Sequence, residues 1–173
     1  EDSGVLFQGQ MVSTRYAYDD NDNVTAKTEA AGIAGQERIT RYAYDAENRL
    51  IRTTDAEGKI TRYGYDAAGD PVWVLDANGT VTVTRKNAQG LVSERVVGEA
   101  SLALNGDPVL AGGLPVITSA YGGIKTRYTY DAAKPALVAS ETTEYADGTG
   151  DAHTTRYTYD ALDRQTTLTD AEG

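Results

Sequence analysis

The stretch Thr40-Arg41-Tyr42-Ala43-Tyr44-Asp45 decides the fold, because the chain returns to this pattern at four other places. The other copies occupy residues 14–19, 61–66, 126–131 and 155–160. The five copies carry two tyrosines each and so hold ten of the 12 tyrosines, whereas the chain has one Phe, one Trp and one Met. An aromatic residue confined to fixed positions of a recurring segment indicates a repeat architecture.

Short segments that begin with Asp and end with Gly separate the apolar stretches and predict turns. Asp at the first position of a turn can accept the backbone N–H two residues later, and Gly or Asn at the fourth adopts the left-handed conformation that a hairpin needs. The turn starts at 45, 55, 66, 76 and 87 lie 10 or 11 residues apart, which leaves room for one strand between turns. The predicted turns are Asp45–Asn48, Asp55–Gly58, Asp66–Gly69, Asp76–Gly79, Asn87–Gly90 and Asp170–Gly173.

Two such steps make a repeat of 21 residues, so the sequence predicts an all-β fold, an antiparallel meander of repeated β-hairpins. Helix is disfavoured because Thr, Tyr, Val and Ile dominate and no 3.6-residue periodicity is present. Alternation along a strand places the two tyrosines of each copy on one face. We expect them to form a packing ladder with aliphatic or Thr side chains of the return strands, and the Arg of each copy to pair with turn carboxylates on neighbouring strands. The repeat-defining residues are Tyr16, Tyr18, Asp19, Tyr42, Tyr44, Asp45, Tyr63, Tyr65, Asp66, Tyr128, Tyr130, Asp131, Tyr157, Tyr159 and Asp160.

The rhythm of the repeat predicts how the chain is divided. It is interrupted after Gly98, where Asn105-Gly106 stands between two apolar stretches and predicts an extra hairpin. At the start, Val5-Leu6-Phe7 is either a leading strand or part of an engineered protease site. The predicted segments are a tag, linker or leading strand at 1–11, hairpin repeats at 12–97, an irregular insertion at 98–124 and hairpin repeats at 125–173.

The composition argues against several functions. The 26 acidic and 16 basic residues give a net charge of −10, which would repel a phosphate backbone, so no nucleic-acid partner is expected. No apolar run approaches the roughly 20 residues that a membrane-spanning helix needs. The chain has no cysteine, so nothing indicates a disulfide or a thiolate site. We expect no catalytic residue, no metal site and no cofactor.

Three features of the sequence could be interpreted as catalytic or metal-binding residues rather than as structural ones. The repeated aspartates start turns, which favours a structural role over acid–base chemistry. The segment Asp19-Asp20-Asn21-Asp22-Asn23 has oxygen-bearing side chains at alternate positions, as a calcium loop does, but it lacks that loop's glycine and distal glutamate. His153 is the one histidine, and no nucleophile for it to activate is marked in the sequence.

The Arg-Tyr-x-Tyr-Asp segments and their Asp-x-x-Gly turns closely resemble the tyrosine–aspartate (YD) repeats of the bacterial rearrangement-hotspot (Rhs) proteins, which Tc-toxin shell components, wall-associated toxins and teneurins share. The resemblance covers residues 12–97 and 125–173. It implies an arc of a hollow β-shell, or of an open wall similar to a β-solenoid. The chain is too short to close a shell, and Asp107-Pro108 followed by Gly112-Gly113-Leu114 has the wrong spacing for the family's self-cleaving segment. We therefore expect a fragment of a longer protein or a short open relative.

Two functions of different classes follow from this resemblance. The first is structural: a segment of a secreted or cell-surface bacterial protein that helps to enclose or display a toxin or effector domain. Its partners would be other YD repeats of a longer parent chain, or the toxin cargo. The second is an adhesin-like module that binds glycan or protein through the tyrosine rows or through residues 98–124. An enzyme is not expected.

Overall fold

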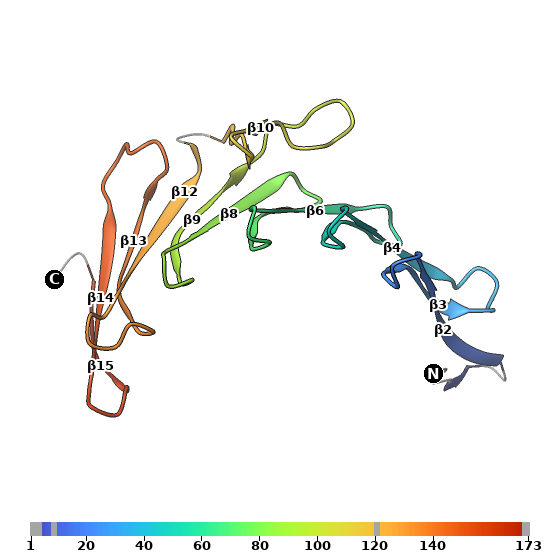
Figure 1. Ribbon diagram of the computed structural model, residues 1–173, viewed down its shortest axis with the longest axis horizontal. Coiled ribbons are helices and arrows are strands. Elements are labelled where there is room, and N and C mark those ends of the chain that lie inside the picture. The colour runs from blue at the N-terminus through green and yellow to red at the C-terminus, as the bar shows by residue number, and fades with distance from the viewer. Residues whose placement is uncertain (1–4, 8–9, 120–121, 171–173) are drawn as a thin grey trace. The chain divides into compact units, whose positions relative to one another are not determined.

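The computed structural model describes residues 5–7, 10–119 and 122–170, with side chains from Ser13 onward. It divides into two compact units, Glu1–Gly69 and Asp70–Gly173. Each unit is an antiparallel meander in which strands that follow one another in the chain are neighbours in the sheet (Figure 1). The prediction of an all-β fold made of repeated hairpins is confirmed. The predicted turn at Asp170–Gly173 lies partly outside the described residues.

The first unit contains six strands in chain order. They pair as successive antiparallel neighbours, so no connection between β2 and β6 crosses the sheet. Thr, Tyr, Val and Ile suit a pleated surface, and an Asp-led turn follows each tyrosine-bearing strand. The strands are β1 (Val5–Phe7), β2 (Gln10–Tyr18), β3 (Val24–Ala31), β4 (Arg38–Tyr44), β5 (Leu50–Thr54) and β6 (Ile60–Tyr65).

The second unit continues the same arrangement and adds a small separate hairpin. Strand β9 pairs with β12 across residues 100–123, which leave the sheet and return to it. Within these residues the Asn105-Gly106 turn is closed by a bridge between Leu102 and Pro108. The main strands are β7 (Pro71–Leu75), β8 (Thr80–Lys86), β9 (Val92–Glu99), β12 (Ile124–Tyr130), β13 (Val138–Tyr145), β14 (His153–Tyr159) and β15 (Gln165–Thr169), and the small hairpin is β10 (Leu110–Ala111) with β11 (Leu114–Pro115).

A bulge lies next to the turn in five described hairpins, four of which carry the repeat tyrosines. In the β4–β5 hairpin, Ala43 pairs with Arg52 but Tyr44 pairs with Leu50, so Ile51 is an extra residue on the return strand. Because the extra residue lies on the return strand, the tyrosine strand stays regular and its two tyrosines keep the same face. The same displacement occurs in four other hairpins, with Thr25, Ser93, Ala139 and Thr166 as the extra residues.

The hydrophobic core of the second unit lies on one face of β7, β8 and β9. Trp73 pairs with Val83, and Leu75 pairs with Val81, so that these four side chains form adjacent rungs. Leu75 and Val81 are almost fully buried, and each contributes about 1.5–3 kcal/mol of hydrophobic stabilisation. The core is completed by Val96 and covered by Leu114, Ile117 and Ala146, two of which come from the insertion.

Two glycines allow the insertion to lie close to the sheet. A Cβ at Gly98 would stand 2.5 Å from Ser119 Oγ and 2.6 Å from Ile117 Cγ2. Gly123 has φ of +91°, and a Cβ there would stand 2.4 Å from the Val97 carbonyl oxygen. Neither position has room for a side chain, so both glycines are needed where the chain leaves and rejoins the sheet. Among the described residues, no helix has the length and apolar character that crossing a bilayer requires.

Candidate functional site

The aspartate of each repeat closes its own turn. The Asp45 Oδ1 accepts hydrogen bonds from the N–H groups of Glu47 (3.0 Å) and Arg49 (2.9 Å), while the Asn48 N–H donates to the Asp45 carbonyl (3.1 Å). Asn48 has φ of +61°, the left-handed conformation expected at the fourth position. The carboxylate therefore satisfies backbone donors that the tight turn would otherwise leave unpaired. The same bond to the N–H two residues later forms at Asp19, Asp55, Asp66, Asp76, Asn87, Asp131 and Asp160.

These bonds lower the pKa values of several turn carboxylates. At Asp160 the backbone N–H and then the side chain of Arg164 lower the pKa of the carboxyl group. At Asp19 the side-chain amide and then the backbone N–H of Asn23 lower the pKa in the same way. In both cases the hydrogen bonds favour the ionised form, which is the form that accepts them.

Within the described residues, the second tyrosine of four of the five repeats, all except Tyr18, joins its hairpin to the preceding one. The Tyr65 hydroxyl donates to the carbonyl oxygen of Leu50 at 2.8 Å, across the pair formed by β6 and β5. Regular pairing of these strands ends at Arg62 and Arg52, so the Leu50 carbonyl lies beyond the ladder. The hydroxyl thus supplies a donor where the two strands separate. We refer to these hydrogen bonds as the tyrosine ties.

Four tyrosine ties follow one rule of register. In each tie, the Arg of the repeat is the last residue of its strand that pairs with the preceding strand. The tyrosine lies three residues after this Arg, and the acceptor carbonyl lies two residues before the residue that pairs with the Arg. The donors and acceptors are Tyr44 to Val24 (3.0 Å), Tyr65 to Leu50 (2.8 Å), Tyr130 to Val92 (2.7 Å) and Tyr159 to Val138 (2.9 Å). Sequence reasoning missed these ties, although the use of Tyr rather than Phe at a fixed position was a signal for the hydroxyl.

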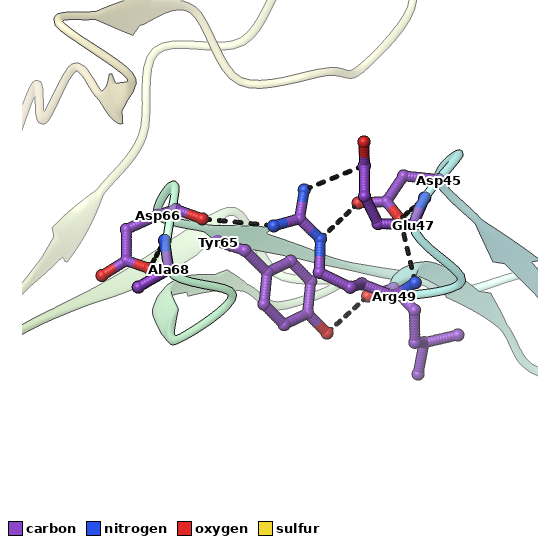
Figure 2. A network of polar contacts seen from close by, with 7 residues as sticks. Asp45, Glu47, Arg49, Tyr65, Asp66 and Ala68 are labelled. Atoms are coloured by element: carbon purple, nitrogen blue, oxygen red, sulfur yellow. Dashed lines mark hydrogen bonds and ion pairs between the residues drawn. The ribbon is translucent and has the colours of Figure 1, made fainter.

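The turns of adjacent hairpins are also joined, and Arg49 shows how (Figure 2). Its Nε lies 2.7 Å from Asp45 Oδ2 in its own turn, and its Nη1 donates to the Asp66 carbonyl of the next turn at 3.1 Å. The guanidinium also lies over the Tyr65 ring, 5.1 Å from the ring centroid. One side chain therefore binds the turn, the next turn and the ring of a tyrosine tie.

Two other places have a comparable turn-to-turn contact. Asn23 Nδ2 donates to Asn48 Oδ1 at 2.8 Å, which joins the first turn to the second. In the second unit, Lys134 Nζ lies 2.6 Å from Asp163 Oδ1 and also donates to the Asp160 carbonyl. These contacts join the turns at Asp19, Asp45 and Asp66 in series in the first unit, and the turns at Asp131 and Asp160 in the second.

The first tyrosine of each repeat has a different environment. Tyr42 lies opposite Thr53 and Tyr157 lies opposite Leu168, as the packing ladder predicts. Tyr16, however, lies opposite Lys27, and Tyr128 lies opposite Glu141. The expected alternation with aliphatic or Thr side chains is therefore wrong at these two strands, where the opposite residue is charged.

The expected pairing of the repeat arginines with turn carboxylates is wrong for Arg127. Its guanidinium lies 2.5 Å from Glu144 and 3.6 Å from Glu94, and both glutamates belong to neighbouring strands rather than turns. Lys125 joins the same group at 3.0 Å from Glu144, and Arg85 pairs with Glu94. The turn carboxylates are instead bound by residues of their own turns, as Arg49 and Arg164 show.

The residues considered for calcium binding and for catalysis lie in the turns and strands described above. Both carboxylate oxygens of Asp19 accept hydrogen bonds inside the turn, from Asn21 and Asn23, so the predicted structural role accounts for them. His153 lies on β14, exposed over 64% of its side chain, with its Nδ1 3.9 Å from Asp170 Oδ1. The described part of the chain contains no group of three or more His, Cys, Asp or Glu side chains that could hold a metal ion.

Comparison with known proteins assigns the repeat. The RHS Repeat family model matches residues 18–60 and again residues 44–81, a region that contains the turns at Asp19, Asp45 and Asp66. No curated protein matches the sequence. The two overlapping matches cover strands β3 to β6 and the two tyrosine ties of the first unit, and they extend into the second.

Several solved structures are similar over nearly the whole chain. A structure of the Photorhabdus luminescens Tc holotoxin pore matches 92% of this chain with 16% identity and a TM-score of 0.43. Crystal structures of TcdB2-TccC3 alone and of TcdB2-TccC3-Cdc42 each match 95% with 20% identity, at TM-scores of 0.30 and 0.29. This chain spans only 9% of the first and 11% of each of the others. The global scores are low and carry no argument, so the assignment depends on the repeat model alone, which identifies RHS repeats within residues 18–81.

Proposed function

We propose that this chain is a wall segment of an Rhs-type bacterial protein, secreted or exposed at the cell surface, that helps to enclose or display a toxin or effector domain. The observation that carries the proposal is the use of the repeat's own polar groups. The second-tyrosine hydroxyls bind the preceding hairpin, and the aspartate carboxylates bind their own turns. These groups serve to connect hairpins, which is what a scaffold requires.

The proposal assigns no enzymatic activity to this segment. Acid–base chemistry needs a carboxylate or imidazole with a pKa near the working pH and a substrate within reach. The pKa values of the Asp19 and Asp160 carboxyl groups are instead lowered, because side-chain and backbone N–H groups donate to them. They are suited to closing turns. The partners of such a wall would be further YD repeats of a longer parent chain and the domain that the wall encloses or displays.

The parent protein provides the test. Its full sequence should encode further YD repeats and a toxin or effector domain next to this segment. In the purified parent, that domain should resist a protease under native conditions if it is enclosed, and should be cleaved once the wall is opened by several Tyr→Phe substitutions at the tyrosine ties. A parent that lacks both further repeats and an effector domain would refute the proposal.

The alternative function is an adhesin-like module that binds glycan or protein. One observation favours keeping it: the insertion exposes several aliphatic side chains, among them Leu104, which is fully exposed at the tip of its turn. A pull-down or glycan array with the intact chain and with a Leu104→Ser variant tests this role. Binding that is indifferent to Leu104 and to the tyrosine pairs would remove it.

A further inference from the structure

The tyrosine rows are interrupted at β8. Asn87 begins a turn with the same bonds as Asp45, because its Oδ1 accepts from the N–H groups of Gln89 and Leu91, both at 3.0 Å. Counting back from this turn, Lys86 stands at the position of the second tyrosine and Thr84 at the position of the first.

The strand register supports this equivalence. Lys86 lies opposite Val92 after a bulge, as Tyr44 lies opposite Leu50 in the β4–β5 hairpin. The carbonyl of Val92 in turn accepts the tie from Tyr130, as that of Leu50 accepts the tie from Tyr65. A threonine therefore occupies the place where the repeat elsewhere has an aromatic ring.

A hollow of about 380 Å³ opens where that ring is missing. This volume lies in the range of small-molecule sites. Thr82 and Thr84 alternate along β8 with Val81 and Val83, whose side chains belong to the core, so the hollow lies on the face opposite the core. Its walls are Thr82 and Thr84 of β8, Val92 and Arg95 of β9, Tyr128 and Tyr130 of β12, and Val138 of β13.

Polar groups with no other hydrogen-bond partner converge on this hollow. The Tyr130 hydroxyl is engaged in its tie to Val92. Among the residues that the structure describes, the Arg95 guanidinium and the hydroxyls of Thr82, Thr84 and Tyr128 make no hydrogen bond, and Arg95 forms no ion pair. Arg95 is also the one charged side chain in the wall, and it is positive in a chain of net charge −10.

The chemistry of the wall favours a sugar over an aromatic side chain. A sugar ring has an apolar face that stacks on tyrosine and hydroxyls that can bond the threonines and the Tyr128 hydroxyl. An aromatic side chain would fill the space and could stack on Arg95, but its ring would desolvate the threonine hydroxyls without offering them a hydrogen bond. The arginine favours a ring that carries a carboxylate, because an arginine–carboxylate pair is charge-assisted and can be bidentate.

We propose that this hollow binds a carboxylated hexose ring of an acidic glycan. Tyr128 stacks on the ring, Thr82 and Thr84 bond its hydroxyls, and Arg95 binds its carboxylate. This inference does not depend on the enclosure role, since a wall segment can expose such a site on one face. It gives the adhesin-like alternative a defined site and ligand class.

The test is a titration of the intact chain by ¹H–¹⁵N NMR with trigalacturonate, and with maltotriose as the neutral counterpart. Trigalacturonate should shift the amides of Thr84 and Arg95 and saturate at concentrations up to about 10 mM, and maltotriose should bind at least about tenfold more weakly. Thr84→Tyr restores the residue that the repeat has elsewhere and should abolish binding. Arg95→Gln should weaken trigalacturonate binding at least about tenfold while leaving maltotriose unchanged. Thr84→Val keeps the shape but removes one hydroxyl, and should weaken both sugars.

The control is Arg41→Gln, which removes an exposed arginine of β4 that does not line the hollow, and it should leave binding unchanged. Preserved amide spectra of each variant show that the fold is intact. The proposal is overturned if trigalacturonate causes no saturable shift, if the two sugars bind equally, or if Thr84→Tyr binds as well as the parent sequence. Saturable binding of N-acetyltyrosinamide at the same amides, without binding of trigalacturonate, would overturn it in favour of a protein side chain.

Discussion

Replacement of Tyr65 by Phe isolates the energy of one tyrosine tie. The substitution removes the hydroxyl that donates to the Leu50 carbonyl at 2.8 Å but keeps the ring that lies 5.1 Å below the Arg49 guanidinium. A hydrogen bond of this kind contributes about 0.5–1.5 kcal/mol net. The tie is only partly buried, so water can reach the released carbonyl, and we expect a loss near the middle of that range, about 1 kcal/mol.

The same strand offers a matched control. Tyr63 lies two residues earlier on β6, and its hydroxyl makes no hydrogen bond with the described residues. Tyr63→Phe should therefore change the free energy of unfolding by less than about 0.5 kcal/mol. Urea unfolding followed by far-UV circular dichroism measures both variants, with an unchanged m-value showing that the unfolding transition is the same. An equal cost for the two substitutions would refute the reasoning, because it would show that ring packing rather than the hydroxyl joins the hairpins.

Three further predictions concern the turns and the insertion. The pKa of the Asp160 carboxyl group is lowered by its hydrogen bonds to Arg164. The carboxylate should therefore contribute its full stabilisation above the unfolded pKa of about 3.9, and this stabilisation should be lost as the pH falls through the lower folded pKa. Asp160→Asn should flatten this part of a stability–pH curve while keeping the turn, as Asn87 does, whereas Asp160→Ala should open the turn. Arg49→Gln should speed amide hydrogen exchange at Ala68 and Gly69 in the next turn, measured by NMR, while the exchange of Gly79 stays unchanged. Gly98→Ala should lower the free energy of unfolding by about 1–3 kcal/mol because its Cβ would overlap Ser119 and Ile117. At Gly90 no atom lies within 4 Å of an added Cβ, so Gly90→Ala should show only the strain of its positive φ. Equal losses for the two variants would contradict the close contact at Gly98.

Local rules in the sequence were enough to predict the hairpins and the turns. Asp45 and Asn48 occupy the positions that turn chemistry assigns to them, and the spacing of successive turns places the strands between them. Alternation likewise places both tyrosines of a copy on one face, and the bulge at Ile51 preserves this because it lies on the return strand. These features depend only on residues within one hairpin.

Contacts between hairpins could not be predicted in the same way. The tie from Tyr65 to Leu50 depends on where two strands separate, and no pattern within either strand specifies that point. The reach of Arg49 to the Asp66 carbonyl likewise depends on the distance between two turns. The expected neutral neighbours of Tyr16 and Tyr128 proved to be Lys27 and Glu141, because the register of a return strand is set by the whole hairpin.

For the hydrophobic core, too, the buried face of the strands could be predicted from the sequence, but the residues that cover it could not. The apolar residues of β8 alternate with threonines and could be recognised as one buried face, whereas β7 is a continuous apolar run in which the burial, and not the residue type, alternates. What covers that face could not be read from the strands, since Leu114 and Ile117 come from the insertion and reach the core only because Gly98 and Gly123 allow close approach.

The central claim is that the second tyrosine of four repeats, through its hydroxyl, joins neighbouring hairpins within each unit. The most direct measurement compares the urea unfolding of two quadruple Tyr→Phe variants, one at the four ties and one at the first tyrosines of the same repeats. The tie variant changes residues 44, 65, 130 and 159, and the control variant changes residues 42, 63, 128 and 157. We predict that the tie variant loses several times the stability that the control loses; equal losses, or a larger loss in the control, would contradict the claim.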